Sequence, residues 1–151
     1  MPTPNRQTRG TCGRRDAYGL MASVVRPGPA FVNAAGSISN IAFGEFRCVS
    51  VIRSLRGSYR SRHYHKTDSH VLYVLEGQMV YWERELDGEY GAPKLVEAGE
   101  SIETGPLVAH QTFFPVNTVV VSASKNPRDS ASHESDVVRV EEPWQIHLIG
   151  S

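Results

Sequence analysis

The feature that most limits how this chain can fold is a series of short apolar segments. Each segment ends at glycine, proline or a polar turn. The clearest are residues 71–75, 79–85, 107–114 and 118–124, which are rich in β-branched and aromatic residues. Asp87-Gly88 is a typical hairpin turn between two such segments. No window has the apolar spacing of a helix of three turns. The pattern predicts an all-β sandwich or barrel.

The length of 151 residues predicts one domain, over residues 18–151. Residues 1–17 are polar and rich in arginine, and we expect a flexible basic arm there. The two cysteines lack CxxC spacing and form no disulfide framework. No apolar run has membrane-spanning length, and the first residues lack the apolar core of a secretory signal. We therefore expect a cytoplasmic protein that does not bind membranes.

The net charge of zero hides a marked asymmetry along the chain. Residues 1–62 contain ten arginines and two acidic residues, whereas the remainder is acidic. A basic half can indicate nucleic-acid binding. However, no known nucleic-acid-binding motif accompanies the arginines, and an antiparallel barrel would pair early strands with late ones. We expect no nucleic-acid partner.

Histidines are the chemically most informative residues of the sequence. His63 and His65 are two apart in a predicted strand, so both side chains point to one face. His70 begins the next apolar run, and His110 lies far along the chain in another predicted strand. Imidazole nitrogen suits zinc, iron, copper and nickel, so these four residues predict a transition-metal site. His133 and His147 are assigned to a polar loop and a terminal strand, outside the site.

The spacing of these histidines resembles the motifs of the cupin superfamily. The first cupin motif matches Gly57, His63, His65 and Gly77, with His70 in place of the usual glutamate. The second matches Gly99 and His110, with Phe114 in place of the usual asparagine. The resemblance covers residues 41–124. It implies a cupin double-stranded β-helix, or jelly roll, with one metal held by His63, His65, His70 and His110.

Strand alternation predicts which other side chains surround the metal. Side chains two apart share a face, so the pocket is predicted to be apolar with a few hydroxyls. The inward hydroxyl of Tyr59 is the candidate catalytic group, and a metal-bound water is the alternative. The remaining predicted pocket residues are Ser61, Leu72, Val74, Thr112 and Phe114.

Chain size, the histidine at the glutamate position and the apolar pocket are similar to those of single-domain cupins that act in aromatic polyketide pathways. That resemblance implies a metal-dependent cyclase of antibiotic biosynthesis, which performs aldol-type cyclisation and aromatisation of a hydrophobic poly-β-keto chain. Zinc is the expected metal, acting as a Lewis acid. One alternative is a dioxygenase with iron, nickel or copper that acts on a diketone or phenol. The other is a non-catalytic module that binds a small molecule, and a homodimer is expected by analogy.

Overall fold

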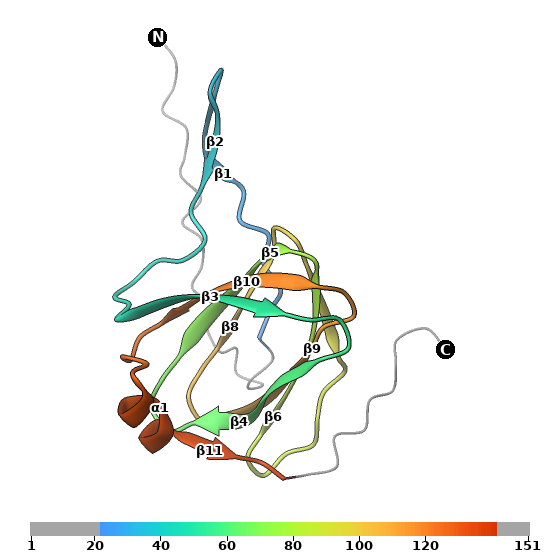
Figure 1. Ribbon diagram of the computed structural model, residues 1–151, viewed down its shortest axis with the longest axis vertical. Coiled ribbons are helices and arrows are strands. Elements are labelled where there is room, and N and C mark those ends of the chain that lie inside the picture. The colour runs from blue at the N-terminus through green and yellow to red at the C-terminus, as the bar shows by residue number, and fades with distance from the viewer. Residues whose placement is uncertain (1–21, 142–151) are drawn as a thin grey trace.

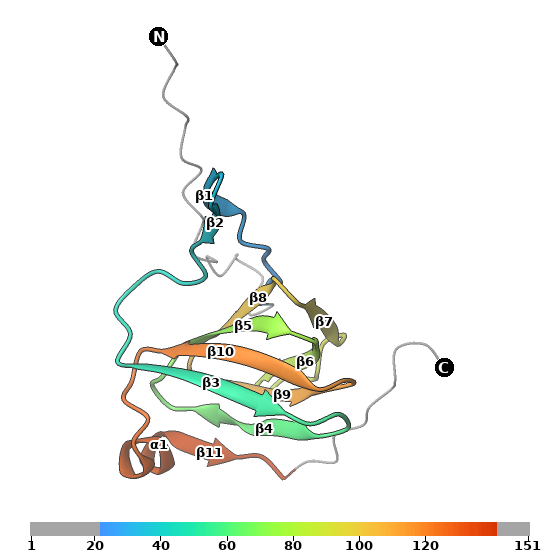
Figure 2. The same cartoon turned by 45° about the horizontal axis from the view of Figure 1, so that its top comes forward.

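The computed structural model describes residues 22–141, which form two facing antiparallel sheets and a separate hairpin (Figures 1 and 2). One sheet has the strand order β3-β10-β5-β8 and the other β11-β4-β9-β6-β7. The predicted all-β jelly roll is confirmed. The elements are β1 (Pro29–Asn33), β2 (Gly36–Ser39), β3 (Cys48–Ser54), β4 (Tyr59–His65), β5 (His70–Glu76), β6 (Gln78–Glu85), β7 (Lys94–Glu97), β8 (Ser101–Thr104), β9 (Val108–Phe113), β10 (Thr118–Ser124), α1 (Ser130–Asp136) and β11 (Val137–Arg139).

The hydrophobic core lies between the two sheets. Both sheets contribute to it, because alternate side chains of each strand point inward. Burying these side chains is the main source of stability. Its buried members are Leu72, Val74, Met79, Tyr81, Val96, Ile102, Phe114 and Val120.

A β-bulge in β4 changes which residues of that strand face the barrel interior. Ser61 and Arg62 have positive φ angles of 70° and 58°. The pairing of β4 with β9 shifts here, so that Arg60 lies opposite Thr112 and His63 opposite His110. One extra residue in a bulge reverses the alternation of the residues before it. Positions 60 and 63 therefore share one face of the sheet.

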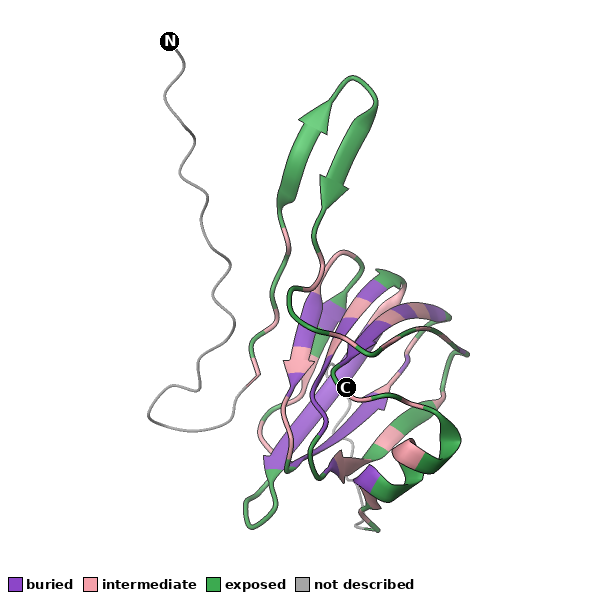
Figure 3. Cartoon of the chain, turned by 90° about the vertical axis from the view of Figure 1, so that its left-hand side faces the viewer, coloured by how far each residue is buried: buried purple, intermediate pink, exposed green. Residues whose placement is uncertain are grey.

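The structure differs from the sequence-based prediction at two segments before the barrel. The small residues at positions 34–40 favour a loop, but Gly36–Ser39 form β2, which pairs with β1. The residues 41–53, rich in Phe, Val and Ile, favour one long strand, but the strand there begins only at Cys48. Every residue of the β1–β2 hairpin is exposed, and the hairpin projects from the barrel (Figure 3). Gly36–Ser39 has a single large apolar side chain, Ile38, among glycine and serine, so it shows no alternating apolar pattern from which β2 could be predicted.

The polar segment 125–136 contains α1, which the sequence analysis did not predict. The Asp129 carboxylate caps this helix by accepting a hydrogen bond from the Ser132 backbone N–H. Because α1 has seven residues and no apolar stripe, it lacks the periodicity that identifies helices. Figures 1 and 2 show α1 at the end of β10, leading directly into β11 beside β4.

The predicted arm over residues 1–17, the predicted strand over 146–149 and His147 lie outside the described residues. Within residues 22–141, no helix is long and apolar enough to cross a membrane.

Gly77, between β5 and β6, occupies a position that excludes a larger residue. Its φ angle is 89°, and an added Cβ would lie 2.5 Å from the Thr118 hydroxyl oxygen. We expect Gly77→Ala to lower the free energy of unfolding by more than about 2 kcal/mol, because backbone strain and a steric clash combine. Urea denaturation followed by circular dichroism measures this loss.

Gly57 is the matched control, since its φ angle is 82° but nothing lies within 4 Å of an added Cβ. Gly57→Ala should lose only the backbone term, about 1 kcal/mol. Equal losses in the two variants would contradict the assigned clash at Gly77.

Candidate functional site

The structure brings together the four histidines that the motif spacing selected. His63 and His65 come from β4, His70 from the start of β5 and His110 from β9. The ring centroids of His63 and His65 are 4.8 Å apart, and those of His63 and His110 are 4.9 Å apart. The His70 ring lies 5.3 Å from both His65 and His110. The cluster therefore joins strands of both sheets at one end of the barrel.

The donor atoms of these histidines fit a metal ion. One nitrogen from each of His63, His65 and His110 lies within 4.8 Å of the others, and His65, Asp68 and His70 form a second such group. His65 belongs to both groups. A transition metal accepts imidazole nitrogen readily, and carboxylate oxygen is a common companion ligand.

Three buried ring nitrogens have no hydrogen-bond partner among the described residues: His65 Nε2, His70 Nδ1 and His110 Nε2. The opposite nitrogen of His110 lies 3.0 Å from the Val108 carbonyl oxygen, to which only an Nδ1–H can donate. This contact leaves a lone pair on His110 Nε2. Buried polar atoms are seldom left without partners, and metal-binding histidines are typically held by their second nitrogen in this way.

Burial keeps the clustered imidazoles neutral. Desolvation, together with repulsion from His110 and His65, lowers the pKa of His63 to about 2. Desolvation lowers the pKa of His110 to about 4 and that of His70 well below its ordinary value. At neutral pH the rings therefore offer lone pairs rather than positive charges, as metal binding requires.

A pocket beside the cluster opens to solvent and contains about 400 Å³ of empty space, including its open part. Four of the predicted pocket residues line it: Ser61, Leu72, Thr112 and Phe114. Val74, the fifth predicted residue, lies in the hydrophobic core and does not line the pocket. The other residues that line the pocket are Ile52, Arg60, His63, His70, Met79, His110, Val120 and Arg128.

Tyr59 lies away from this pocket, contrary to the prediction from alternation. Its ring is 4.8 Å from that of Phe113, and the Arg62 guanidinium lies over it. The β4 bulge is the reason, because it turns Arg60 inward in place of Tyr59. A bulge formed by Ser61 and Arg62 leaves no clear signal in the sequence, so the prediction could not include it.

Sequence reasoning missed several polar residues beside the cluster. The His133 ring, on α1, lies 5.9 Å from that of His65 and 6.3 Å from that of His63, and it is half-buried. Arg128 enters the pocket wall and donates from Nε and Nη2 to Asp68 Oδ2. The only available signal was the density of polar residues in segment 125–136, which resembles an ordinary solvated loop.

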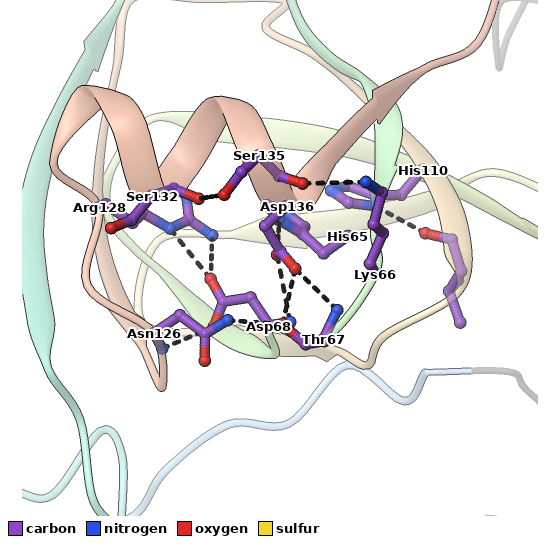
Figure 4. A network of polar contacts seen from close by, with 11 residues as sticks. His65, Lys66, Thr67, Asp68, His110, Asn126, Arg128, Ser132, Ser135 and Asp136 are labelled. Atoms are coloured by element: carbon purple, nitrogen blue, oxygen red, sulfur yellow. Dashed lines mark hydrogen bonds and ion pairs between the residues drawn. The ribbon is translucent and has the colours of Figure 1, made fainter.

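Figure 4 shows the polar network that attaches this segment to the turn between β4 and β5. The Asp136 carboxylate accepts hydrogen bonds from the Thr67 backbone N–H and hydroxyl and from the Asp68 backbone N–H. Asp68 in turn accepts from the Asn126 backbone N–H and from Arg128. The network ties the turn between His65 and His70 to α1 and to the segment that precedes it.

No family model and no curated protein matches the sequence. Solved structures do match the fold. The sugar 3,4-ketoisomerase QdtA of Thermoanaerobacterium thermosaccharolyticum has a TM-score of 0.63 and 19% identity, over 80% of this chain and 88% of that chain. A dTDP-4-dehydrorhamnose 3,5-epimerase of Sulfolobus tokodaii has a TM-score of 0.67 and 14% identity, over 87% and 85%. The TDP-quinovose 3,4-ketoisomerase WlaRB of Campylobacter jejuni has a TM-score of 0.62 and 14% identity, over 74% and 89%.

These matches establish a cupin-type jelly-roll fold for this chain. They also correct the predicted function, because the matched proteins are sugar-nucleotide isomerases and epimerases. The predicted metal-dependent polyketide cyclase of antibiotic biosynthesis is therefore wrong. Neither the dioxygenase nor the non-catalytic alternative describes the matched proteins. The error arose because pocket polarity and chain size, unlike the histidine spacing, are shared by cupins of many activities.

Proposed function

We propose that this chain is an isomerase of small hydroxyketones, with the keto-sugar of a sugar nucleotide as the expected substrate. The observation that carries the proposal is the convergence of four neutral imidazoles beside an open pocket that Arg60 and Arg128 also line. Guanidinium groups suit a substrate that carries phosphate. The isomerase activity of proteins with the same fold supports the reaction class.

The same imidazoles are proposed to hold one divalent transition metal. His63, His65, His70 and His110 would be the ligands, and zinc is expected ahead of iron or nickel from the general affinity order; copper also fits the donors. Such a metal would supply a Lewis acid for a substrate carbonyl oxygen. The unpartnered nitrogens of His65, His70 and His110 support this assignment.

The reaction proposed for this site moves two protons, one between carbons and one between oxygens, and needs no oxidant. A base removes the proton from the hydroxyl-bearing carbon next to the carbonyl group, and the electron pair of that C–H bond moves into an enediolate. A proton then returns to the former carbonyl carbon, and the hydroxyl proton passes to the former carbonyl oxygen, which gives the isomeric ketone. Imidazole is the side chain most often used for such transfers. We assign it to His133, which adjoins His63 and lies outside the proposed ligand set.

Solvent exchange tests the proposed function directly. The purified protein, loaded with zinc, is incubated in D2O with TDP-4-keto-6-deoxyglucose, and proton NMR follows the position next to the carbonyl. We expect loss of that proton signal and formation of an isomeric ketone, both faster than in a protein-free sample. Exchange at the protein-free rate would overturn the isomerase proposal.

His133→Ala separates metal binding from proton transfer. We expect this variant to retain zinc affinity within about threefold and to lose exchange by about a hundredfold or more, the usual range for a general base. Zinc competition with a chromophoric chelator and the NMR exchange assay provide the two readings. Ser132→Ala, on the same helix, is the control and should leave both unchanged. Normal exchange in His133→Ala would remove the assigned base.

The homodimer stays a prediction. Phe31, Val32 and Ile38 on the exposed β1–β2 hairpin support it, because such apolar side chains favour burial against another surface.

A further inference from the structure

Asp136 is a buried carboxylate at the end of α1, and it contacts one of the clustered imidazoles. Its Oδ2 lies 3.2 Å from His65 Nδ1, although the two residues are 71 positions apart in the chain. His65 is 1% exposed, and its Nε2 has no hydrogen-bond partner among the described residues. The two nitrogens of this ring therefore have very different surroundings (Figure 4).

We infer that Asp136 is a positioning residue that holds His65 as the Nδ1–H tautomer and leaves the Nε2 lone pair available to the histidine cluster. The inference deepens the proposed metal site, since a neutral imidazole can bind a metal only through its unprotonated nitrogen. Asp136, far from His65 in the sequence, would thus determine how this proposed metal ligand is oriented.

The hydrogen-bond partners of the carboxylate support this role. Asp136 Oδ1 accepts from the Thr67 backbone N–H and hydroxyl, and Oδ2 accepts from the Asp68 backbone N–H. With donors already on both oxygens, Asp136 can act toward His65 only as an acceptor. Of the two neutral tautomers of His65, the Nδ1–H form donates to this carboxylate.

The opposite tautomer would be unfavourable on both sides of the ring. Its Nδ1 lone pair would face the negatively charged Asp136 oxygen at 3.2 Å. Its Nε2–H would be buried without an acceptor among the described residues. Burying an unsatisfied donor and opposing a lone pair to a carboxylate are both costly.

Main-chain contacts fix Asp136 in place relative to His65. Val137, the next residue, pairs with His65 between β11 and β4. The Lys66 backbone N–H donates to the Asp136 carbonyl oxygen at 2.9 Å. The pairing of β11 with β4 therefore holds the Asp136 backbone beside His65.

The metal-free wild-type protein provides the first test. Long-range proton–nitrogen NMR of 15N-histidine-labelled protein distinguishes the two tautomers by the pattern of couplings to the ring protons. We expect the Nδ1–H pattern for His65, assigned by comparison with His65→Gln. An Nε2–H pattern in the wild type would overturn the inference, whatever the variants do.

Asp136→Asn provides the second test. An amide has one oxygen, so if that oxygen keeps the two Thr67 donors, its NH2 group faces His65 and donates to Nδ1. We expect His65 to change to the Nε2–H tautomer and zinc affinity to fall about tenfold to a hundredfold. Chelator competition measures the affinity. An unchanged tautomer in a folded Asp136→Asn protein would overturn the inference.

Glu134→Gln is the matched control, because this carboxylate lies on the same helix but is exposed and pairs with Arg139. It should change neither tautomer nor zinc affinity. The tautomer is measured without metal or substrate. The role of Asp136 and the proposed function are therefore tested independently of each other. An Nδ1–H tautomer in a protein that neither binds zinc nor isomerises ketones would remove the function and leave the positioning role.

Discussion

His110→Ala is expected to lower zinc affinity more than about a hundredfold. His110 is fully buried, and its Nε2 is one of the nitrogens without a hydrogen-bond partner among the described residues. Removing it breaks the group of three imidazole nitrogens that lie within 4.8 Å of one another. Loss of a ligand should exceed the tenfold to hundredfold effect typical of residues that only orient ligands. Chelator competition on the purified variant measures the change.

His63→Ala tests whether the loss of zinc affinity in His110→Ala comes from the missing ligand or from misfolding. His63 is only half-buried and lines the pocket, so its removal should leave the core packed. We expect the same loss of zinc affinity with a nearly unchanged unfolding transition. His133→Ala, the matched histidine outside the proposed ligand set, should bind zinc as the wild type does. Wild-type affinity in both His63→Ala and His110→Ala would contradict the four-histidine site.

Glu83→Ala is expected to lower the free energy of unfolding by about 3–5 kcal/mol, as when one partner of a buried ion pair is removed. Glu83 is 4% exposed. Its Oε1 lies 3.0 Å from Lys94 Nζ, and its Oε2 accepts a hydrogen bond from the Tyr81 hydroxyl at 3.0 Å. The substitution leaves both partners without this acceptor. Urea denaturation measures the loss.

The effect of Glu83 should extend to the histidine cluster. The Tyr81 ring stacks on His110 at a centroid distance of 6.2 Å, so Glu83 supports that imidazole through Tyr81. Glu85→Ala is the control, because Glu85 is exposed on the same strand and should cost less than about 0.5 kcal/mol. Equal losses for Glu83→Ala and Glu85→Ala would contradict the role of the buried pair.

Strand positions and the histidine cluster could be predicted because both depend on local spacing. β10 has the bounds of the predicted segment 118–124, and β5, β6 and β9 differ from their predicted segments by at most one residue at either end. The histidines of β4 could be assigned to one face because the strand is regular between His63 and His65. The prediction failed before His63, where the bulge at Ser61 and Arg62 turned Tyr59 outward and Arg60 inward.

The function could not be predicted from the same residues, for a chemical reason. Four imidazoles define what a site can bind, but not which substrate enters beside them. The residues that would distinguish substrates include Arg60 and Arg128, which come from a bulged strand and from a polar segment. Neither has a signature in the sequence, so the polyketide prediction rested on chain size, the histidine at the glutamate position and the apolar pocket.

The sequence by itself determined the all-β class and the four clustered imidazoles, because strand alternation and turn residues act over a few positions. Only the tertiary structure decided the surroundings of those imidazoles. Asp136 reaches His65, and Glu83 reaches Lys94 and Tyr81, through pairing of strands and burial in the folded chain. Such contacts depend on the register of strands distant in sequence and on bulges, which no local pattern specifies.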